Sequence, residues 1–546
     1  MKRFLWLGCA LFLLLVWCGC GDTFRPIIIP NPPVFPNPKA AHTVVSINDN
    51  GTIVRGSAMV IDVSGDTDVS VADVGLAPVY AVQQSTSQVL VVNHSVAGAA
   101  GDSITRLNFN GTTIGTTTAI SLPADSAPNF VAVAPTDILA YVSLPNFTPP
   151  SVAVVNTQSA NVVTTAPVGN NPVAIAVTPD KSKIYIANQG DSTISGLNAQ
   201  GPSQRTGSPT HTSSPPIWLV ARNDNQRVYA LEESTGILAE LDTTATAGPD
   251  LLTEYPSSYS VPGATFMVYD SNKNRLYIPG GPVMKIIDIS QSPAQVLATI
   301  SIPSVPGLPG PTAASAVAVA ALPDGSRAYV ASVANSALPS QVSISAVQGD
   351  GTTATYTYTW TGGHDLTPGI PVTVTGIASP DDGFNGTYLI TTVSGTSCNQ
   401  PTQGCTFQAA NSTVLKTQTP VIGLASSPTD NLFPQVSVVD VSSNSVTKTI
   451  GIPGFPDATN PSTPLYYAPV CAPPTPYRAT FRFKMAAGGD SSRVYLSSCD
   501  GGNVNIIDTS NDTYILNLPA PVGVRPPIPP NPANPPQNPV FLFAGP

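Results

Sequence analysis

Short apolar runs separated by turn residues dominate the chain from about residue 42 onward. In the clearest stretch, an apolar strand at 173–177 is followed by a turn at 179–181, a second strand at Lys183–Asn188, a polar loop and a third strand at Thr193–Asn198. Runs of this length, bounded by Gly, Pro, Asn and Asp, predict short strands joined by tight turns. Because no apolar period of 3.6 residues appears in these stretches, a helical repeat is excluded.

The second strand of this unit recurs along the chain. Its equivalent positions are Leu90, Tyr141, Tyr185, Tyr229, Tyr277, Tyr329 and Tyr495, spaced by 44–52 residues except for a last gap of 166. A period of this size is typical of a four-stranded propeller blade. The sequence therefore predicts an all-β protein, a β-propeller of four-stranded blades.

The number of blades depends on the chain ends. Seven copies of the repeat have all four strands, and an incomplete set at 42–48, 57–63 and 68–74 precedes them. A last apolar segment at 540–544 supplies a strand for ring closure. We predict seven blades; the alternative is eight blades, with a composite blade that mixes strands from both ends. Inner strands such as 173–177 and 317–321 are small and apolar, as expected near a crowded axis.

The repeat resembles a known family. PVAIAVTPDKSKIYIANQGDSTISGLN is similar to the YVTN-type bacterial β-propeller repeat, with Tyr185-Ile186-Ala187-Asn188 in the place of the namesake tetrapeptide, and residues 322–331 show the same turn and strand. The resemblance covers roughly residues 57–340 and 434–521. It implies the propeller fold and leaves function open, because such propellers include secreted surface proteins, lactonase-like enzymes and haem-enzyme relatives.

The gap before Tyr495 contains an insertion in a late blade. Residues 340–432 interrupt that blade between its second and third strands, and they carry strand patterns of their own at 354–360, 369–377, 386–393 and 405–410. We expect a small β-module; the alternative is a decorated loop. An interaction role is favoured because binding is often carried by loops on a rigid scaffold. A second, proline-rich excursion covers 453–481.

The N-terminus has the pattern of an export signal. Lys2 and Arg3 precede an apolar run at 4–16, and Gly19 precedes Cys20, which resembles the lipobox of bacterial lipoproteins. We predict a signal at 1–20 with lipid attached to Cys20; the alternative is an ordinary secretory signal cut nearby. The protein would then be exported and anchored in the bacterial cell envelope, on the periplasmic or surface side, with the membrane as a partner through this lipid.

The remaining segments follow from these predictions. A proline-rich tether covers 21–41, the first part of the propeller 42–339, its last part 433–521, and a proline-rich tail with a possible closing strand 522–546.

Cysteine positions are consistent with export. Removal of the signal and lipidation of Cys20 leave Cys398, Cys405, Cys471 and Cys499, an even number in an oxidising compartment. Cys398 and Cys405 bracket a short polar loop and are predicted to pair, which leaves Cys471 with Cys499. A metal site is disfavoured because there is no CxxC spacing and there are only four histidines.

The charge balance argues against one class of partner. Charged residues make up 10% of the chain, with 22 Lys and Arg against 32 Asp and Glu, a net charge of −10. Nucleic-acid binding is disfavoured because it requires clustered basic residues. The acidic run at 62–68 has oxygen ligands suited to Ca²⁺ but lacks a closing glutamate, so a solvated hairpin turn is favoured.

No catalytic motif emerges from the sequence. The histidines lie in separate segments, and HExxH, GxSxG and P-loop patterns are absent, so we assign no catalytic residue, no metal ligand and no cofactor. The favoured function is a non-catalytic lipoprotein scaffold for a protein, peptide or glycan. The alternative is a secreted lactonase-like or other hydrolytic enzyme, which would require groups such as His94, Asp191 and Glu232 to converge at the axis.

Overall fold

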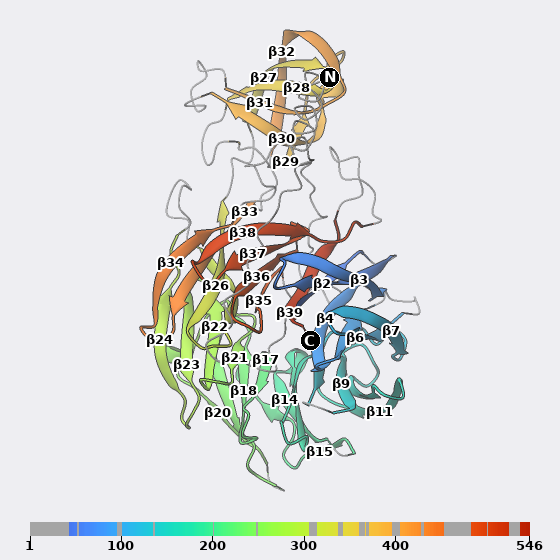
Figure 1. Ribbon diagram of the computed structural model, residues 1–546, viewed down its shortest axis with the longest axis vertical. Helices are drawn as coiled ribbons and strands as arrows, with labels where there is room; N and C mark the ends of the chain where they lie inside the picture. Colours follow the sequence, from blue (N-terminus) through green and yellow to red (C-terminus); the bar gives the residue numbers. More distant parts are fainter. Residues whose placement is uncertain are drawn as a thin grey trace, which may run out of the picture.

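The computed structural model describes most of the chain after residue 42. The described ranges are 43–51, 54–94, 101–134, 137–199, 201–246, 249–304, 314–336, 342–359, 366, 371–395, 405–426, 431–452, 482–499, 501–523 and 536–545. These residues form eight antiparallel sheets and one closed barrel. Figure 1 shows the sheets arranged around a common centre as the blades of a propeller, with the barrel beyond its edge.

The strands of each blade are given below in order from the axis outward. The first four blades contain the strands of the N-terminal half of the chain and the last strand, β39. Blade 1 contains β39 (Asn538–Ala544), β1 (Thr43–Asp49), β2 (Arg55–Asp62) and β3 (Thr67–Leu76). Blade 2 contains β4 (Pro78–Ser85), β5 (Gln88–Asn93), β6 (Ser103–Asn110) and β7 (Thr113–Ser121). Blade 3 contains β8 (Val131–Val133), β9 (Leu139–Leu144), β10 (Ser151–Asn156) and β11 (Asn161–Pro167). Blade 4 contains β12 (Pro172–Val177), β13 (Lys183–Asn188), β14 (Thr193–Asn198), β15 (Ser203–Gln204) and β16 (Thr210–His211).

The other four blades follow the same order. Blade 5 contains β17 (Pro216–Ala221), β18 (Arg227–Glu232), β19 (Leu238–Asp242) and β20 (Leu251–Glu254). Blade 6 contains β21 (Val268–Asp270), β22 (Arg275–Gly280), β23 (Val283–Asp288) and β24 (Gln295–Ser301). Blade 7 contains β25 (Ser315–Ala321), β26 (Arg327–Ser336), β33 (Asn431–Asp440) and β34 (Ser445–Gly451). Blade 8 contains β35 (Phe483–Ala487), β36 (Arg493–Ser498), β37 (Asn503–Asp508) and β38 (Thr513–Pro519).

Helix is confined to three single turns among the described residues: η1 (Gln189–Asp191), η2 (Ser257–Tyr259) and η3 (Asp382–Phe384). Within the part of the chain that the structure describes, no helix has the length and apolar character needed to cross a bilayer.

Ring closure decides the number of blades. The C-terminal strand β39 pairs with the N-terminal strand β1, with Val45 opposite Phe543 and Ile47 opposite Phe541. The two chain ends therefore build one composite blade, and the prediction of seven blades is wrong. The alternative of eight blades with a composite blade is confirmed, because the incomplete N-terminal set needed only one more strand to become a full sheet.

The repeated tyrosines lie between neighbouring blades. All six are fully buried: Tyr141, Tyr185, Tyr229, Tyr277, Tyr329 and Tyr495. Tyr185 donates a hydrogen bond of 2.9 Å to Asp250, which precedes the outer strand of blade 5. Tyr329 donates to Asp512 in the outer turn of blade 8, and Arg327 Nη1 lies 2.6 Å from the same carboxylate. The sequence repeat thus marks a contact that joins one blade to the next.

The acidic run at 62–68 forms the turn between β2 and β3. Asp62 Oδ1 accepts a hydrogen bond of 3.0 Å from the backbone of Ser64, and Asp66 adopts a left-handed conformation with φ of 51°. Blade 8 repeats this turn, with Asp508 accepting from Ser510 and Asp512 at φ of 55°. The run is therefore one copy of a recurring hairpin turn, as the favoured interpretation predicted.

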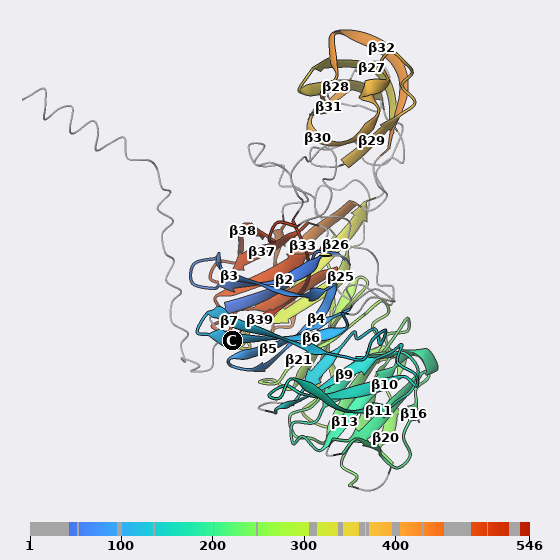
Figure 2. The same ribbon diagram turned by 90° about the vertical axis from the view of Figure 1, so that its right-hand side faces the viewer.

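The insertion in blade 7 folds as a separate barrel. Its strands are β27 (Val342–Asp350), β28 (Thr353–Thr359), β29 (Pro371–Thr375), β30 (Gly386–Ser394), β31 (Cys405–Ala410) and β32 (Val414–Ser426), closed in the order β27-β28-β31-β30-β29-β32. Tyr356, Phe384 and Phe407 lie at the centre of a core distinct from that of the propeller. Figure 2 shows the barrel beyond the ends of β26 and β33. A β insertion in a late blade is thus confirmed.

Candidate functional site

The barrel defines one face of the propeller. Because adjacent strands of a blade are antiparallel, the turn between the second and third strands lies on the same face as the connection to the next blade. The barrel interrupts blade 7 between its second strand, β26, and its third strand, β33. We call this side the insertion face. His94, Asp191 and Glu232 all lie at the end of a second strand, and they therefore also lie at the insertion face.

His94 lies at the end of blade 2 and is 2% exposed. Burial lowers the pKa of its imidazole, and the nearby Asp102 carboxylate opposes that shift. Asp102 accepts hydrogen bonds from the backbone of Ser126 at 2.8 Å and of Ala127 at 3.0 Å. These contacts attach the connection between blades 2 and 3 to blade 2, which is a structural role.

Asp191 belongs to the turn of blade 4 and is engaged locally. Its carboxylate accepts a hydrogen bond from the backbone of Asn170 at 2.9 Å and one from the hydroxyl of Thr193 at 2.6 Å. Both donors belong to blade 4 or to the connection that enters it. Asp191 therefore fixes its own turn.

Glu232 is the most perturbed acid of the insertion face. Its side chain is fully buried, and its carboxyl accepts hydrogen bonds from Ser213 Oγ at 3.0 Å and from the backbone of Ser214 at 2.8 Å. Burial raises the pKa of Glu232 to about 7, and the neighbouring Glu254 adds to the shift. Glu254 accepts a hydrogen bond of 2.6 Å from the backbone of Ser213, so one short segment connects the two carboxyl groups.

The structure places His94, Asp191 and Glu232 in blades 2, 4 and 5, where each has its own local partners. Among the described residues, no three His, Cys, Asp or Glu side chains are grouped so that they could hold a metal ion. The convergence that a lactonase-like centre requires is not formed by these three residues.

A second group of side chains meets at the axis, and sequence reasoning did not find it. It takes one residue from each blade, which we call the axial ring: Phe541, Tyr80, Phe130, Ala174, Trp218, Phe266, Ala318 and Lys484, in order of blade number. In six blades, the ring residue pairs with the fifth residue of the second strand; the pairs are Phe541–Ile47, Tyr80–Val92, Ala174–Ala187, Trp218–Leu231, Ala318–Ala331 and Lys484–Ser497. The ring therefore lies at one level, just beneath the insertion face.

The aromatic members contact one another around and across the axis. Tyr80 stacks on Phe130 with ring centroids 4.2 Å apart and lies 4.5 Å from Phe541, so blades 1, 2 and 3 are joined. Trp218 of blade 5 lies 6.3 Å from Tyr80 and 5.5 Å from Phe130, although its blade is not adjacent to either of theirs. Such edge and offset contacts are the preferred geometries of aromatic pairs. Side chains of non-adjacent blades meet only if they point toward the axis.

At two places, side chains of non-adjacent blades contact each other because the blade between them has only an alanine in the ring. Blades 3 and 5 meet through Phe130 and Trp218 beside Ala174 of blade 4, and blades 6 and 8 meet through Phe266 and Lys484 beside Ala318 of blade 7. The expectation of small inner strands came from these two blades and holds for them, whereas the inner strands of blades 1, 2, 5 and 8 carry Phe541, Tyr80, Trp218 and Lys484. Since a larger ring of blades encloses a wider axis, large side chains are needed to occupy it.

Lys484 is the only charged member of the axial ring. Its Nζ lies 4.5 Å from the centroid of Phe266 and 5.5 Å from that of Phe541, within the range of cation–π interactions. Burial lowers the pKa of this amine to about 8. Part of its surface is nevertheless accessible, as is part of Trp218.

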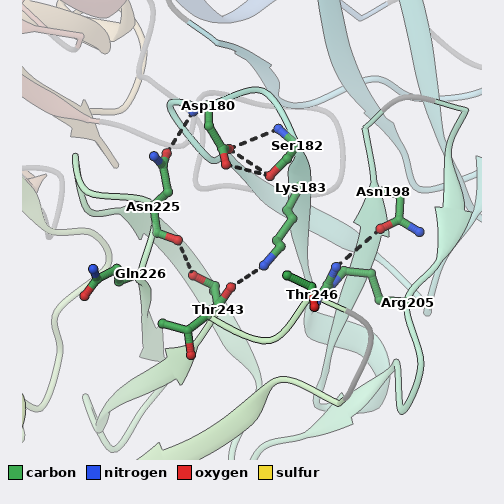
Figure 3. A pocket seen from close by; sticks show the side chains of 10 residues that line it. Asp180, Ser182, Lys183, Asn198, Arg205, Asn225, Gln226, Thr243 and Thr246 are labelled. Carbon is green, nitrogen blue, oxygen red and sulfur yellow. Dashed lines mark hydrogen bonds between the residues drawn. The ribbon is translucent and has the colours of Figure 1, made fainter.

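A polar hollow of about 520 Å³ lies between blades 4 and 5 on the opposite face (Figure 3). Its charged groups are already engaged by protein. Lys183 Nζ donates to the carbonyl oxygens of Thr243 and Ala245, and Arg205 forms an ion pair of 2.8 Å with Asp250. The hollow is therefore a polar seam between blades.

The barrel exposes apolar side chains along its longest strand. Val414, Ile422 and Leu424 of β32 are 60%, 90% and 41% exposed. All three lie at even positions, and Leu415 and Val421 at odd positions pack against the barrel core. The outer face of β32 thus exposes three apolar side chains, with the exposed Lys416 and Gln418 between Val414 and Ile422.

Several predicted residues cannot be placed. The signal, the tether and Cys20 lie outside the described residues, as do Cys398, Cys471 and the excursion at 453–481. Cys405 and Cys499 are buried. The two disulfide pairings and the lipid anchor stay predictions.

Comparison with known proteins finds only distant structural similarity. No family model matches the chain, and none of the curated proteins does. Among solved structures, apo AztD from Citrobacter koseri is 9% identical with a TM-score of 0.48, covering 92% of this chain and 97% of that chain. A functionally unknown protein from Desulfotomaculum acetoxidans is 12% identical with a TM-score of 0.43, covering 54% and 90%. A protein from Lactobacillus plantarum is 15% identical with a TM-score of 0.39, covering 60% and 95%. At these values the similarities carry no inference about fold or function, and the YVTN-type repeat stays a prediction.

Proposed function

We propose that this protein is an exported, lipid-anchored and non-catalytic scaffold of the bacterial cell envelope. Its insertion face would hold a protein, peptide or glycan partner. The single observation that carries this proposal is the barrel: a complete domain-like unit, with its own core, set into one turn of a rigid ring. Recognition elements are commonly mounted in this way, on loops that a rigid scaffold positions.

The surface of the barrel supports the same role. The exposed side chains of Ile422 and Leu424 lie two residues apart on one face of β32, and adjacent exposed apolar side chains are a feature of interaction surfaces. The acidic net charge argues against a nucleic-acid partner. The export signal and Cys20 are sequence features that favour a position of this surface outside the cytoplasm.

The test is a binding comparison with and without the barrel. Ser336 and Asn431 face each other in the ladder of β26 and β33, so a short linker can replace the residues between them without moving either strand. We expect the shortened protein to fold and to lose the partner that the full protein captures from envelope extracts or on glycan and peptide arrays. Retention of the same partner by the shortened protein would refute the proposal.

A hydrolytic function is the second candidate, and one observation favours it. Glu232, with its pKa raised to about 7 by burial, and Glu254 form a pair of carboxyl groups at the insertion face. A protonated acid beside a second carboxyl group is the equipment of many hydrolases. Hydrolysis of lactone or glycoside substrates that disappears in Glu232→Gln, with unchanged folding, would support this function over the scaffold.

A further inference from the structure

The polar hollow between blades 4 and 5 is larger than a packing defect. Its volume of about 520 Å³ lies within the range of roughly 300–1,000 Å³ that small-molecule sites occupy. Its walls are the turn between β12 and β13 and the ends of β14 and β15 from blade 4, and the turn between β17 and β18 with the segment after β19 from blade 5. All ten lining residues carry side chains that can form hydrogen bonds. A ligand of this hollow is therefore hydrophilic.

Contacts across the seam hold the walls of the hollow in place. The backbone N–H of Asp180 donates to Asn225 Oδ1 at 2.8 Å, and Lys183 Nζ donates to two backbone carbonyl oxygens of blade 5. Arg205 donates to both carboxylate oxygens of Asp250, at 2.8 and 2.9 Å. Side chains that are already ordered lose less conformational entropy when a ligand binds.

The charges around the hollow balance one another. Lys183 and Arg205 are the cations of its wall, and the carboxylates of Asp180 and Asp250 lie beside them. Asp242, a third carboxylate near Lys183, forms an ion pair of 3.0 Å with an arginine of its own blade. A bound anion would meet these carboxylates, and a bound cation would meet the lysine and the arginine. A neutral ligand adds no uncompensated charge.

Hydrogen-bonding groups in the wall remain available to a ligand. Within the part of the chain that the structure describes, the side chains of Gln226 and Thr246 form no hydrogen bond with protein, and both residues are exposed. The Nδ2 of Asn225 is likewise unused, because this side chain is held through its Oδ1. Figure 3 shows Asn225 and Gln226 on one side of the hollow and Asn198 and Arg205 on the other. Amides and hydroxyls both donate and accept hydrogen bonds, and so do the hydroxyl groups of a sugar.

We propose that the polar hollow is a binding site for a neutral mono- or disaccharide. Sugar hydroxyl oxygens accept hydrogen bonds from Asn225 Nδ2 and from the third N–H of Lys183, whose other two are used by blade 5. Sugar hydroxyl groups donate to the amide oxygen of Gln226 and to the hydroxyl oxygen of Thr246. The balanced charge of the wall selects against acidic and amino sugars.

This site is separate from the one in the proposed function. The hollow lies on the face of the propeller opposite the barrel, and it shares no residue with the barrel. Deletion of the barrel is expected to remove the macromolecular partner and to leave saccharide binding intact. Failure of one proposal is therefore distinguishable from failure of the other.

The test is a titration of the full-length protein with defined sugars, followed by saturation-transfer difference NMR. The neutral probes are glucose, galactose, mannose, maltose, cellobiose and lactose, and we expect saturable binding of at least one of them. The uronic acid and the 2-amino sugar with the configuration of the bound ring are the charged controls. Both are expected to bind more weakly than the neutral sugar.

Two substitutions locate the bound sugar. Gln226→Ala and Thr246→Val each remove a group that has no hydrogen-bond partner among the described residues, so folding should be unchanged. Each should weaken binding about two- to tenfold, the loss expected for one neutral hydrogen bond, and the double variant should bind more weakly than either. Asn223→Ala is the matched control, because Asn223 lies in the same turn as Gln226 but does not line the hollow. Thermal unfolding verifies that all variants fold.

Three results would overturn the proposal. The absence of saturable binding for all six neutral sugars would show that the hollow is a hydrated seam only. Binding of the charged controls that equals or exceeds that of the neutral sugar would contradict the argument from charge balance. Wild-type affinity in the folded double variant would place the sugar elsewhere on the protein.

Discussion

Glu232 makes the stability of the propeller depend on pH in a way that one substitution removes. Its carboxyl is fully buried at the seam between blades 4 and 5, and burial raises its pKa from 4.5 to about 7. The folded state therefore holds the proton more tightly than the unfolded state. For an acid with a raised pKa, stability is greatest below the unfolded pKa and is lost as the pH rises toward and through the folded pKa.

The magnitude follows from that shift. Each pKa unit corresponds to about 1.4 kcal/mol, so the whole effect is about 3 kcal/mol, of which about 2–3 kcal/mol falls between pH 5 and pH 9. Glu232→Gln imitates the protonated acid. Its amide oxygen can still accept from Ser213 and Ser214, and its amide nitrogen can donate to Glu254. The variant should therefore lack this component of the pH dependence.

The assay is urea unfolding of the wild type and of Glu232→Gln at pH 5, 7 and 9. The free energy of unfolding of the variant should exceed that of the wild type by about 2–3 kcal/mol more at pH 9 than at pH 5. Glu254→Gln serves as the matched variant, and it should reduce the pH-dependent loss because Glu254 contributes to the raised pKa of Glu232. A constant difference between wild type and Glu232→Gln across this range would refute the reasoning.

Three further predictions concern the seams, the ring closure and the N-terminus. Asp512→Ala removes the hydrogen-bond acceptor of Arg327 and Tyr329 and should lower the free energy of unfolding by about 1–3 kcal/mol. Asn444→Ala, at the same left-handed turn position of blade 7, is the control and should lower it less in the same urea unfolding assay. Deletion of 538–546 removes β39, exposes the edge of β1, and should abolish the folded monomer in gel filtration, whereas a tag after Pro546 should not. Intact mass of the mature protein should show acylated Cys20, and non-reducing peptide mapping should show Cys398–Cys405 and Cys471–Cys499; a free N-terminus elsewhere would contradict the lipoprotein prediction.

The blades are predictable from the sequence because their signals are local. Seven of the eight second strands carry a tyrosine or leucine at the same position. The turn after the third strand repeats an Asx hydrogen bond, as at Asp62 and Asp508, and so does the turn after the first strand, as at Asp180 and Asp324. These features recur at a similar spacing, so the fold can be recognised without knowledge of any distant contact. The closing strand is also visible in the sequence, but its partner is not, and the sequence alone therefore allows both seven and eight blades.

The barrel is predictable only in part. The sequence predicts four of its six strands, which alternate apolar and polar residues, and does not predict β27 and β32. The apolar residues of β32 alternate between the core and the solvent, with Ile422 outside and Val421 inside, and Pro420 interrupts the run. A strand that presents apolar side chains on both faces gives no clear period-2 signal.

The axial ring was missed because it is assembled from eight separate segments. Its sequence signal is one large residue within the inner strand of a blade or just before it, in six of the eight blades: Phe541, Tyr80, Phe130, Trp218, Phe266 and Lys484. The two inner strands with the clearest small apolar pattern belong to blades 4 and 7, where the ring has alanine. Alignment of all eight inner strands, rather than inspection of the most regular copies, would have revealed it.

The central claim, that the insertion face carries the partner, is tested most directly by site-specific photo-crosslinking in cells that produce the protein. A benzophenone amino acid would replace Ile422, the most exposed of the three apolar residues of β32, or Asn223, an exposed residue in the turn between β17 and β18 on the opposite face. The account predicts a discrete adduct from position 422 and none from position 223. An adduct from position 223 with none from position 422 would contradict it.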